Sequence, residues 1–298
     1  MTVKEYRDKG VEKLMPLYPK EEAKALLDMV LEHFCRLPLH LYYTDPDRLL
    51  PPECLPDLQK ALYDLLKARP IQYIVGKTLF EGCTIMVREG VLIPRPETAE
   101  LVRWAKDVAT SAPPSLRLLD LCTGSGAIAI ALAKTLPQAK VVGIDISAEA
   151  LEIAQENSRL NRVEVDFLRA DILQSPTLEP PLLPHSFDLL LSNPPYVRLS
   201  EKAYMHPKVL DYEPHSALFV PDHDPLLFYR ALADWGVTLL KEGGLLMAEI
   251  NEQMGKEVEA LWNNTGYTSV QLRTDLNGKP RMIAAVHSPI FSYICRQI

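Results

Sequence analysis

The segment Ser-Asn-Pro-Pro-Tyr at 192–196 contains residue types that can hold a planar amino group. It follows a short apolar run, which predicts a buried strand. Pro194 and Pro195 fix φ and carry no N–H, so the chain leaves the sheet along a rigid path. The side-chain amide of Asn193, the carbonyl of Pro194 and the flat ring of Tyr196 then suit an amide or an adenine edge. The same residues are also compatible with a purely structural turn.

A glycine-containing loop is the second candidate for chemistry. Residues 120–126 read Asp-Leu-Cys-Thr-Gly-Ser-Gly and join an apolar strand to a helix of small residues. Gly124 and Gly126 allow a sharp turn and let a ligand approach the main chain closely. A tight strand-to-helix turn without a ligand needs the same glycines, so the loop alone does not decide between the two interpretations.

Two acidic residues near the ends of the following strands support a ligand site. Asp145 lies nineteen residues after Gly126, at the end of the second predicted strand, where a carboxylate can accept from both hydroxyls of a ribose. Asp171 ends the third predicted strand, and Asp171 and Ile172 are placed to contact the amino group and the face of an adenine. Ligands bind outside the carboxyl ends of parallel strands, so the sequence predicts a nucleoside-type cofactor.

The loop also bears on which cofactor that is. A dinucleotide site usually has a third glycine where this chain has Ala129, a residue that the pattern permits, so spacing does not exclude NAD. Asp120, just before the loop, suits a ligand with a positive ammonium or sulfonium group better than a pyrophosphate. S-adenosylmethionine carries both groups, and the sequence favours it.

The elements that position these residues alternate between strands and helices from residue 115 onward. This alternation predicts an α/β fold with a doubly wound, mostly parallel sheet. No helix separates the last two strands, so one of them is expected to run antiparallel at the end of the sheet. Strands are predicted at 116–121, 141–146, 163–168, 187–191, 245–250, 268–272 and 282–286, and helices at 97–108, 127–136, 148–160, 226–240 and 252–264.

The N-terminal part of the chain has a different pattern. Apolar residues at three- and four-residue spacing predict amphipathic helices over 21–36 and 55–68. We therefore expect a small helical domain over 1–72, a β-hairpin linker over 73–96 that begins in the β-favouring residues from Ile71, and the α/β domain over 97–298.

Composition narrows the function classes. The net charge of −7 argues against a nucleic-acid duplex as the main partner, because binding to duplexes rests on neutralised phosphates. There is no apolar segment of signal-peptide length near the N-terminus and no apolar run long enough to span a membrane. The five cysteines are scattered without a Cys-x-x-Cys, and the three histidines between 206 and 223 lack metal-site spacing. We expect a cytoplasmic protein without a metal site.

Taken together, the loop, the strand-end aspartate and Asn-Pro-Pro-Tyr resemble the methyltransferases that act on exocyclic or amide nitrogens. Motifs at 92–98 (Leu-Ile-Pro-Arg-Pro-Glu-Thr), 213–219 (Glu-Pro-His-Ser-Ala-Leu-Phe) and 275–281 (Asp-Leu-Asn-Gly-Lys-Pro-Arg) narrow the match. Over about 20–287 the chain is similar to the release-factor glutamine methyltransferases, the HemK or PrmC family.

This resemblance implies a seven-stranded methyltransferase sheet and an S-adenosylmethionine-dependent enzyme that releases S-adenosylhomocysteine. It implies methylation of the side-chain nitrogen, N5, of the glutamine in the Gly-Gly-Gln motif of class-1 peptide chain release factors, with the helical domain helping to dock the factor. We expect a monomer that binds no nucleic acid directly.

The expected site residues form two groups. Contacts to the cofactor are predicted for Asp120, Cys122, Thr123, Gly124, Ser125, Gly126, Asp145, Asp171, Ile172 and Asn193. Contacts to the substrate are predicted for Asn193, Pro194, Pro195 and Tyr196, of which Asn193, Pro194 and Tyr196 are expected to take part in catalysis.

The chain departs from the family pattern at two cofactor contacts. Cys122 stands where the loop usually has its first glycine, and Ile172 stands where an aromatic residue is common. Affinity for the cofactor is the property these departures put in doubt. Two other functions stay open at this point: an adenine methyltransferase acting on nucleic acid and an NAD-dependent oxidoreductase.

Overall fold

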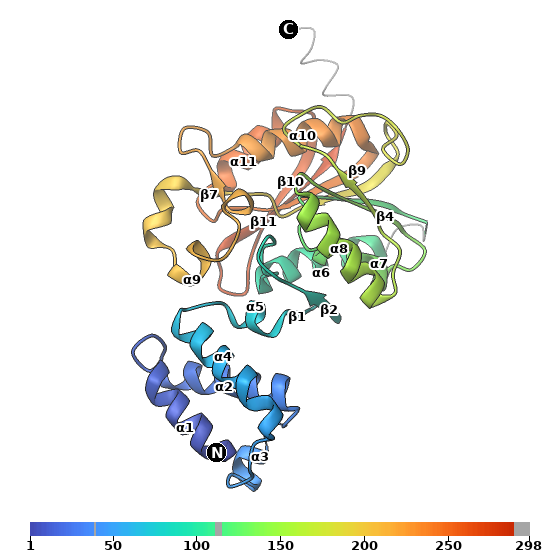
Figure 1. Cartoon of the computed structure of the whole chain (residues 1–298). Coiled ribbons are helices and arrows are strands. Elements are labelled where there is room, and N and C mark those ends of the chain that lie inside the picture. The colour runs from blue at the N-terminus through green and yellow to red at the C-terminus, as the bar shows by residue number, and fades with distance from the viewer. Residues whose placement is uncertain (39, 111–114, 289–298) are drawn as a thin grey trace. The chain divides into compact units, whose positions relative to one another are not determined.

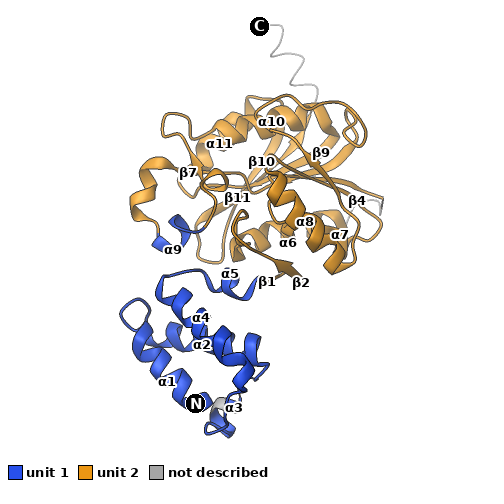
Figure 2. Ribbon diagram, viewed as in Figure 1, with its two compact units in different colours: residues 1–77, 206–212 blue, residues 78–205, 213–298 orange. Residues whose placement is uncertain are grey.

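The computed structural model describes residues 1–38, 40–110 and 115–288 (Figure 1). The chain divides into two compact units, which we call the helical unit and the sheet unit (Figure 2). The helical unit contains residues 1–77 and 206–212, and the sheet unit contains residues 78–205 and the chain from 213 onward. None of the described helices is both long enough and apolar enough to cross a membrane.

The helical unit is built around the amphipathic helices expected from the sequence. Thr2 and Glu5 form a capping box at the start of the first helix. The hydroxyl of Tyr6 donates to the carbonyl of Leu58 at 2.9 Å and so joins the first helix to a later one inside a shared apolar core. The helices are α1 (Val3–Leu14), α2 (Lys20–Cys35), α3 (Leu41–Thr44), α4 (Leu55–Leu66) and α5 (Ile71–Val75), with a 3₁₀ turn at Pro52–Cys54.

Helix α5 corrects one expectation. The β-favouring residues from Ile71 to Val75 form a helical turn that begins after Pro70 and ends at Gly76, whose φ is +73°. Ile71 is buried in the core of the helical unit, so packing outweighs local strand preference. The hairpin begins only after this turn, with β1 (Lys77–Phe80) and β2 (Cys83–Met86).

Residues 206–212, which include the short helix α9 (Pro207–Leu210), belong to the helical unit although they lie far along the chain. The hydroxyl of Tyr212 donates to the carbonyl of Lys67 at 2.9 Å, and the guanidinium carbon of Arg69 lies 5.7 Å from the centre of the Tyr212 ring. Nothing in the local pattern of this segment indicated that association. A segment that begins about ten residues after the Asn-Pro-Pro-Tyr corner is thus part of the helical unit.

The sheet unit contains the seven-stranded sheet, in the order β10-β11-β9-β6-β3-β4-β5. The five strands from β9 to β5 pair in parallel, and β11 pairs antiparallel with both of its neighbours. The antiparallel strand is therefore the second from the edge. The strands are β3 (Arg117–Leu121), β4 (Lys140–Asp145), β5 (Asp166–Arg169), β6 (Phe187–Ser192), β9 (Leu240–Glu249), β10 (Tyr267–Thr274) and β11 (Pro280–His287).

Helices cover the two faces of this sheet, as expected for a doubly wound fold. Figure 1 shows α6 (Pro96–Thr110), α7 (Ala127–Thr135) and α8 (Ala148–Asn161) on one face and α10 (Leu227–Leu239) and α11 (Gly255–Asn263) on the other. Two short strands, β7 (Val197–Arg198) and β8 (Phe219–Val220), pair outside the main sheet. The main core contains residues from the central strands and from α10 and α11.

Gly143 in β4 shows how closely the sheet approaches the predicted cofactor loop. A Cβ there would lie 2.7 Å from Cε1 of Phe167 and 3.0 Å from Oγ1 of Thr123. We expect Gly143→Ala to lower the free energy of unfolding by roughly 1–3 kcal/mol, because the core must shift to admit the methyl group. Gly255→Ala is the control, since the nearest atoms to its Cβ would be 3.5 Å away. Equal urea midpoints for the two variants would contradict this expectation.

Candidate functional site

The predicted site residues gather at one edge of the sheet because β3, β4 and β6 are parallel. In the strand register, Leu121 pairs with Ile144 on one side and with Ser192 on the other. The hydroxyl of Ser192 also donates to the carbonyl of Leu121 at 2.7 Å. The glycine-containing loop, Asp145 and Asn193 therefore leave the sheet at neighbouring positions.

The loop itself has an unusual backbone. Cys122, Gly124 and Gly126 all have positive φ, at 60°, 54° and 79°. Gly126 is the N-cap of α7, and a Cβ there would lie 3.0 Å from Cδ1 of Ile130. The position of Cys122 thus has the conformation that glycine tolerates best, which gives a physical reason for a glycine at this point in related loops.

Asp120 lies beneath the loop and is fully buried. Its Oδ2 accepts from the hydroxyl of Thr123 at 2.5 Å and from the amide of Ala129 at 3.2 Å. Its Oδ1 is buried without a hydrogen-bond partner among the described residues. Burial raises the pKa of Asp120 to about 7, against the opposing effect of these two hydrogen bonds. A buried carboxyl with an unsatisfied oxygen is a group that a cationic ligand would stabilise.

Asp145 joins the loop to the end of β4. Its Oδ2 accepts from the amide of Gly124 at 2.8 Å, and its Oδ1 accepts from the amide of Ser147 at 2.9 Å. Burial raises the pKa of Asp145, and its backbone hydrogen bonds oppose that effect. Each carboxylate oxygen has a further lone pair, so Asp145 can hold the loop and still accept from ligand hydroxyls.

Asp171 and Ile172 lie beyond the end of β5, which is shorter than expected and stops at Arg169. Oδ1 of Asp171 accepts from the amide of Leu173 at 2.9 Å. Ile172 is 5% exposed and belongs to the main core. The contact between Ile172 and an adenine, expected from the sequence, stays a prediction.

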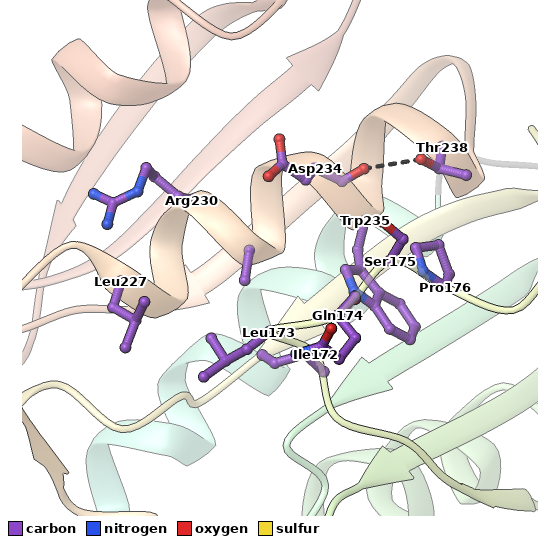
Figure 3. A pocket seen from close by; sticks show the side chains of 11 residues that line it. Ile172, Leu173, Gln174, Ser175, Pro176, Leu227, Arg230, Asp234, Trp235 and Thr238 are labelled. Atoms are coloured by element: carbon purple, nitrogen blue, oxygen red, sulfur yellow. Dashed lines mark hydrogen bonds between the residues drawn. The ribbon is translucent and has the colours of Figure 1, made fainter.

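Ile172 also lines a pocket of about 240 Å³ between the segment 172–176 and α10 (Figure 3). The indole N–H of Trp235 donates to the carbonyl of Gln174 at 2.8 Å and so ties the two walls together. Ile172 is the only predicted site residue among those lining this pocket. The pocket is therefore distinct from the loop and from the Asn-Pro-Pro-Tyr corner.

The corner is held by a chain of hydrogen bonds that begins at Asn193. The Nδ2 of Asn193 donates to the hydroxyl oxygen of Thr98 at 3.0 Å, and that hydroxyl donates to Oε2 of Glu249 at 2.6 Å. The hydroxyl of Tyr196 donates to Oε1 of Glu249 at 2.7 Å. Pro194 and Pro195 are buried. The structure thus connects Tyr196 directly, and Asn193 through Thr98, to the carboxyl group of Glu249.

Burial governs the acid–base properties of this corner. It raises the pKa of Glu249, against the effect of the hydrogen bonds from Thr98 and Tyr196. It also raises the pKa of Tyr196 well above its ordinary value, together with the nearby charge of Glu249. Tyr196 is therefore a neutral phenol at physiological pH, able to donate but not to act as a base.

Sequence reasoning missed Thr98 and Glu249 as parts of this corner. Thr98 is the last residue of the motif at 92–98, but it received no role. Glu249 is an acidic residue at the end of β9, the same signal that identified Asp145 at the end of β4. Applied to every strand end, that signal would have found Glu249.

Asn157 was missed for a different reason. This fully buried residue of α8 accepts from the amide of Met86 at 2.7 Å and donates to the carbonyls of Met86 and Ser125. It therefore links strand β2 of the hairpin to the cofactor loop. A single asparagine inside a helix carries no sequence signal for such a role.

Arg95, in the motif at 92–98, pairs with a carboxylate of its own unit. Its Nη2 lies 2.5 Å from Oε1 of Glu213, and the other oxygen of Glu213 accepts from the amide of Ile93 at 3.2 Å. The motifs at 92–98 and 213–219 are thus joined. Glu213 directly follows the segment that belongs to the helical unit.

Cys122 offers a direct test of whether the loop thiol is reactive. Burial is the main cause that raises the pKa of Cys122 far above its ordinary value, so little thiolate is present at pH 8. We expect Cys122 in the folded protein to react with iodoacetamide at least about tenfold more slowly than in the urea-unfolded protein. Peptide mass spectrometry reports each cysteine separately. Equal rates in the two states would show a reactive loop thiol.

Comparison with known proteins shows which family this chain resembles. A family model described as a methyltransferase domain matches residues 113–275. The release factor glutamine methyltransferase of Flavobacterium psychrophilum is 41% identical over 285 residues, which cover 95% of this chain and 98% of that protein. The protein of the same name from Bacteroides thetaiotaomicron is 42% identical over 272 residues, which cover 91% and 95%.

A solved structure extends the comparison to the fold. The crystal structure of a methyltransferase from Pyrococcus furiosus matches with a TM-score of 0.52 and 17% identity, over 76% of this chain and 99% of that one. This similarity shows the methyltransferase fold.

Proposed function

The chain belongs to the family of release factor glutamine methyltransferases, and from this membership we propose its substrate and the residues that act on it. The substrate is the glutamine of the Gly-Gly-Gln motif in class-1 peptide chain release factors. The enzyme transfers a methyl group from S-adenosylmethionine to the N5 nitrogen of that side chain and releases S-adenosylhomocysteine.

One observation carries the assignment of the substrate group: the acceptor corner at the end of β6. The Nδ2 of Asn193 is engaged by Thr98, and among the described residues no donor reaches its Oδ1. Pro194 adds a carbonyl and has no N–H of its own. Two acceptors side by side match the two N–H bonds of a primary carboxamide.

The residues of the loop fit the cofactor. The buried Oδ1 of Asp120 is unpartnered, and a ligand with an ammonium or sulfonium group would stabilise its charge. Gly124 and Gly126 have positive φ and no Cβ, so a ligand can approach the backbone closely at these two positions. Asp145 keeps lone pairs for ribose hydroxyls. We assign the cofactor to these residues together with Cys122, Thr123, Ser125, Asp171, Ile172 and Asn193. When bound, S-adenosylmethionine supplies an electrophilic methyl group.

The chain's own residues overcome the poor nucleophilicity of a carboxamide nitrogen by positioning it. Oδ1 of Asn193 and the carbonyl of Pro194 accept the two N–H bonds, so the nitrogen lone pair is presented to the methyl carbon. Tyr196 packs beside the amide plane. A bond forms between nitrogen and methyl carbon while the methyl–sulfur bond breaks, and the proton on nitrogen leaves to solvent afterwards. Positioning of this kind can supply several of the about 7–11 kcal/mol available from proximity and orientation.

We assign docking of the release factor to the helical unit. Tyr63 on α4 is 57% exposed and Leu66 is 38% exposed, and apolar groups of this kind suit a protein partner. The segment 206–212 connects this unit to the chain that follows the catalytic corner.

Transfer of labelled methyl from S-adenosylmethionine tests the function directly. The acceptors are a class-1 release factor, its variant with Gln→Ala in Gly-Gly-Gln, and duplex DNA. We expect label on the unchanged factor alone. Label on DNA would indicate an adenine methyltransferase, and label on the Gln→Ala variant would show that another residue is the acceptor. Absence of label from all three would overturn the proposal.

A further inference from the structure

We propose that Thr98 and Glu249 are positioning residues that set which end of the Asn193 amide faces the substrate. The inference rests on the proposed function and adds residues that do not touch the reacting atoms. An asparagine side chain can present either its oxygen or its NH2 group to a ligand, and the two ends have nearly the same shape. Shape alone therefore does not determine whether Asn193 presents its oxygen or its NH2 group to the substrate. Hydrogen bonds from the protein must decide.

The hydrogen bonds that orient Asn193 start from the carboxylate of Glu249. It is 1% exposed, and its two oxygens accept from the hydroxyls of Thr98 and Tyr196 at 2.6 and 2.7 Å. Against the effect of burial, the hydrogen bonds from Thr98 and Tyr196 and the nearby charge of Arg281 lower the pKa of Glu249 and favour its ionised form. The ionised carboxylate has no hydrogen to give, so each hydroxyl directs its single hydrogen toward Glu249. The hydroxyl hydrogen of Thr98 is used in this hydrogen bond and cannot be donated to another group.

The direction of this hydrogen bond determines which group donates in the next one, between Thr98 and Asn193. Once its hydrogen points to Glu249, the oxygen of Thr98 can only accept, and the group that faces it must be a donor. Nδ2 of Asn193 fills that place at 3.0 Å. The Oδ1 of Asn193 then points away from Thr98 and toward the substrate side of the corner. An acceptor at this position accepts an N–H of the glutamine amide, whereas an NH2 group there would oppose it.

Thr98 is well suited to this role because it is itself fixed. It is 4% exposed, in the first turn of α6, three residues after Arg95. Glu249 is the last residue of β9, the strand beside β6 in the sheet. Thr98 and Glu249 therefore lie on a helix and a strand of the fold. The Asn193 amide is oriented before the substrate binds, so it does not have to reorient during the reaction.

Two substitutions of Thr98 separate orientation from packing. Thr98→Val keeps the branched shape and removes the hydroxyl, and Thr98→Ser keeps the hydroxyl and removes a methyl group. We expect Thr98→Val to lower kcat on the release factor by roughly 10- to 100-fold, with KM and the Kd for S-adenosylmethionine changed less than about threefold. Thr98→Ser is expected to recover most of that loss. Thr265→Val is the control, because it removes a half-buried threonine hydroxyl that donates to the carbonyl of Leu261, in the turn after α11.

Glu249→Gln tests the first group in this series of hydrogen bonds and keeps a side chain of the same size. A glutamine NH2 can donate to Thr98, which frees the Thr98 hydroxyl to donate to Oδ1 of Asn193 and reverse the amide. We expect a loss of kcat similar to that in Thr98→Val, and an unchanged thermal melt would confirm the fold. If Thr98→Ser is impaired as much as Thr98→Val, or if Glu249→Gln keeps full kcat while folded, the inference is wrong.

A measurement independent of methyl transfer keeps this inference separate from the proposed function. The side-chain NH2 resonances of ¹⁵N-labelled Asn193, assigned by their loss in Asn193→Ala, report whether Nδ2 is bonded to the protein. We expect slow exchange with water in the unchanged enzyme and in Thr98→Ser, and fast exchange in Thr98→Val. Fast exchange in the unchanged enzyme would overturn the inference even where the release factor is methylated. If the release factor is not methylated while exchange follows this pattern, the proposed substrate fails and the orientation of Asn193 stands.

Discussion

Asn193→Ala is expected to reduce methyl transfer by a factor of about 10² or more, with the affinity for S-adenosylmethionine changed only a few-fold. The substitution removes the acceptor that holds one N–H of the substrate amide and also the donor to Thr98. The loop contacts that involve Asp120 and Asp145 do not depend on this side chain. Single-turnover transfer of labelled methyl measures the chemical step, and calorimetry measures binding of S-adenosylmethionine.

The control for this variant is Asn264→Ala, at the exposed C-cap of α11. It should retain the turnover of the unchanged enzyme. The assignment of Asn193 fails if its alanine variant loses binding of S-adenosylmethionine while the transfer step at saturating cofactor stays intact. That result would place Asn193 in the cofactor site alone.

Binding of S-adenosylmethionine should weaken as the pH falls below about 7. Burial raises the pKa of Asp120 to about 7, so this carboxyl is increasingly neutral in the ligand-free protein below that pH. A cationic ligand favours the carboxylate, and binding at lower pH must therefore release a proton. We expect the Kd to rise by up to about tenfold per pH unit below 7, measured by calorimetry in buffers of different ionisation enthalpy.

The same group makes the ligand-free protein less stable at higher pH. The folded-state pKa of about 7 lies above the value near 3.9 expected in the unfolded chain, so the native state binds more protons between these values. Stability from this group is complete at low pH and decreases as the pH rises through that window, by at most about 4 kcal/mol. Asp145, whose pKa is also raised by burial, acts in the same direction.

Asp120→Asn should flatten both pH profiles and bind S-adenosylmethionine more weakly at neutral pH. Asp166→Asn, at an exposed position of β5, is the matched control and should leave them as they are. A Kd for S-adenosylmethionine that stays constant between about pH 5 and 8 would show that Asp120 does not titrate in this range.

Much of the fold could be predicted from local pattern. Each central strand is a run of apolar residues buried on both faces, and each helix has a stripe of apolar residues, so periodicity identified all seven strands of the main sheet. Several boundaries were wrong, and β9 began at Leu240, five residues before the predicted start. The segment 71–75 became α5 because its apolar residues could be buried against the helical unit, and β5 began three residues later than expected.

The sequence by itself determined the residue types at the carboxyl edge of the sheet: the loop at 120–126, Asp145 and the Asn-Pro-Pro-Tyr corner. Parallel strands bring their ends to one edge, so these residues had to meet once the strand order was known. Only the tertiary structure could show that Thr98 and Glu249, 151 positions apart, hold Asn193 and Tyr196. Only the tertiary structure placed 206–212 with the helical unit and linked Asn157 to the loop. The physical reason is that a periodic apolar pattern is a property of neighbouring residues, whereas the partner of a buried polar group is chosen by the packing of distant segments.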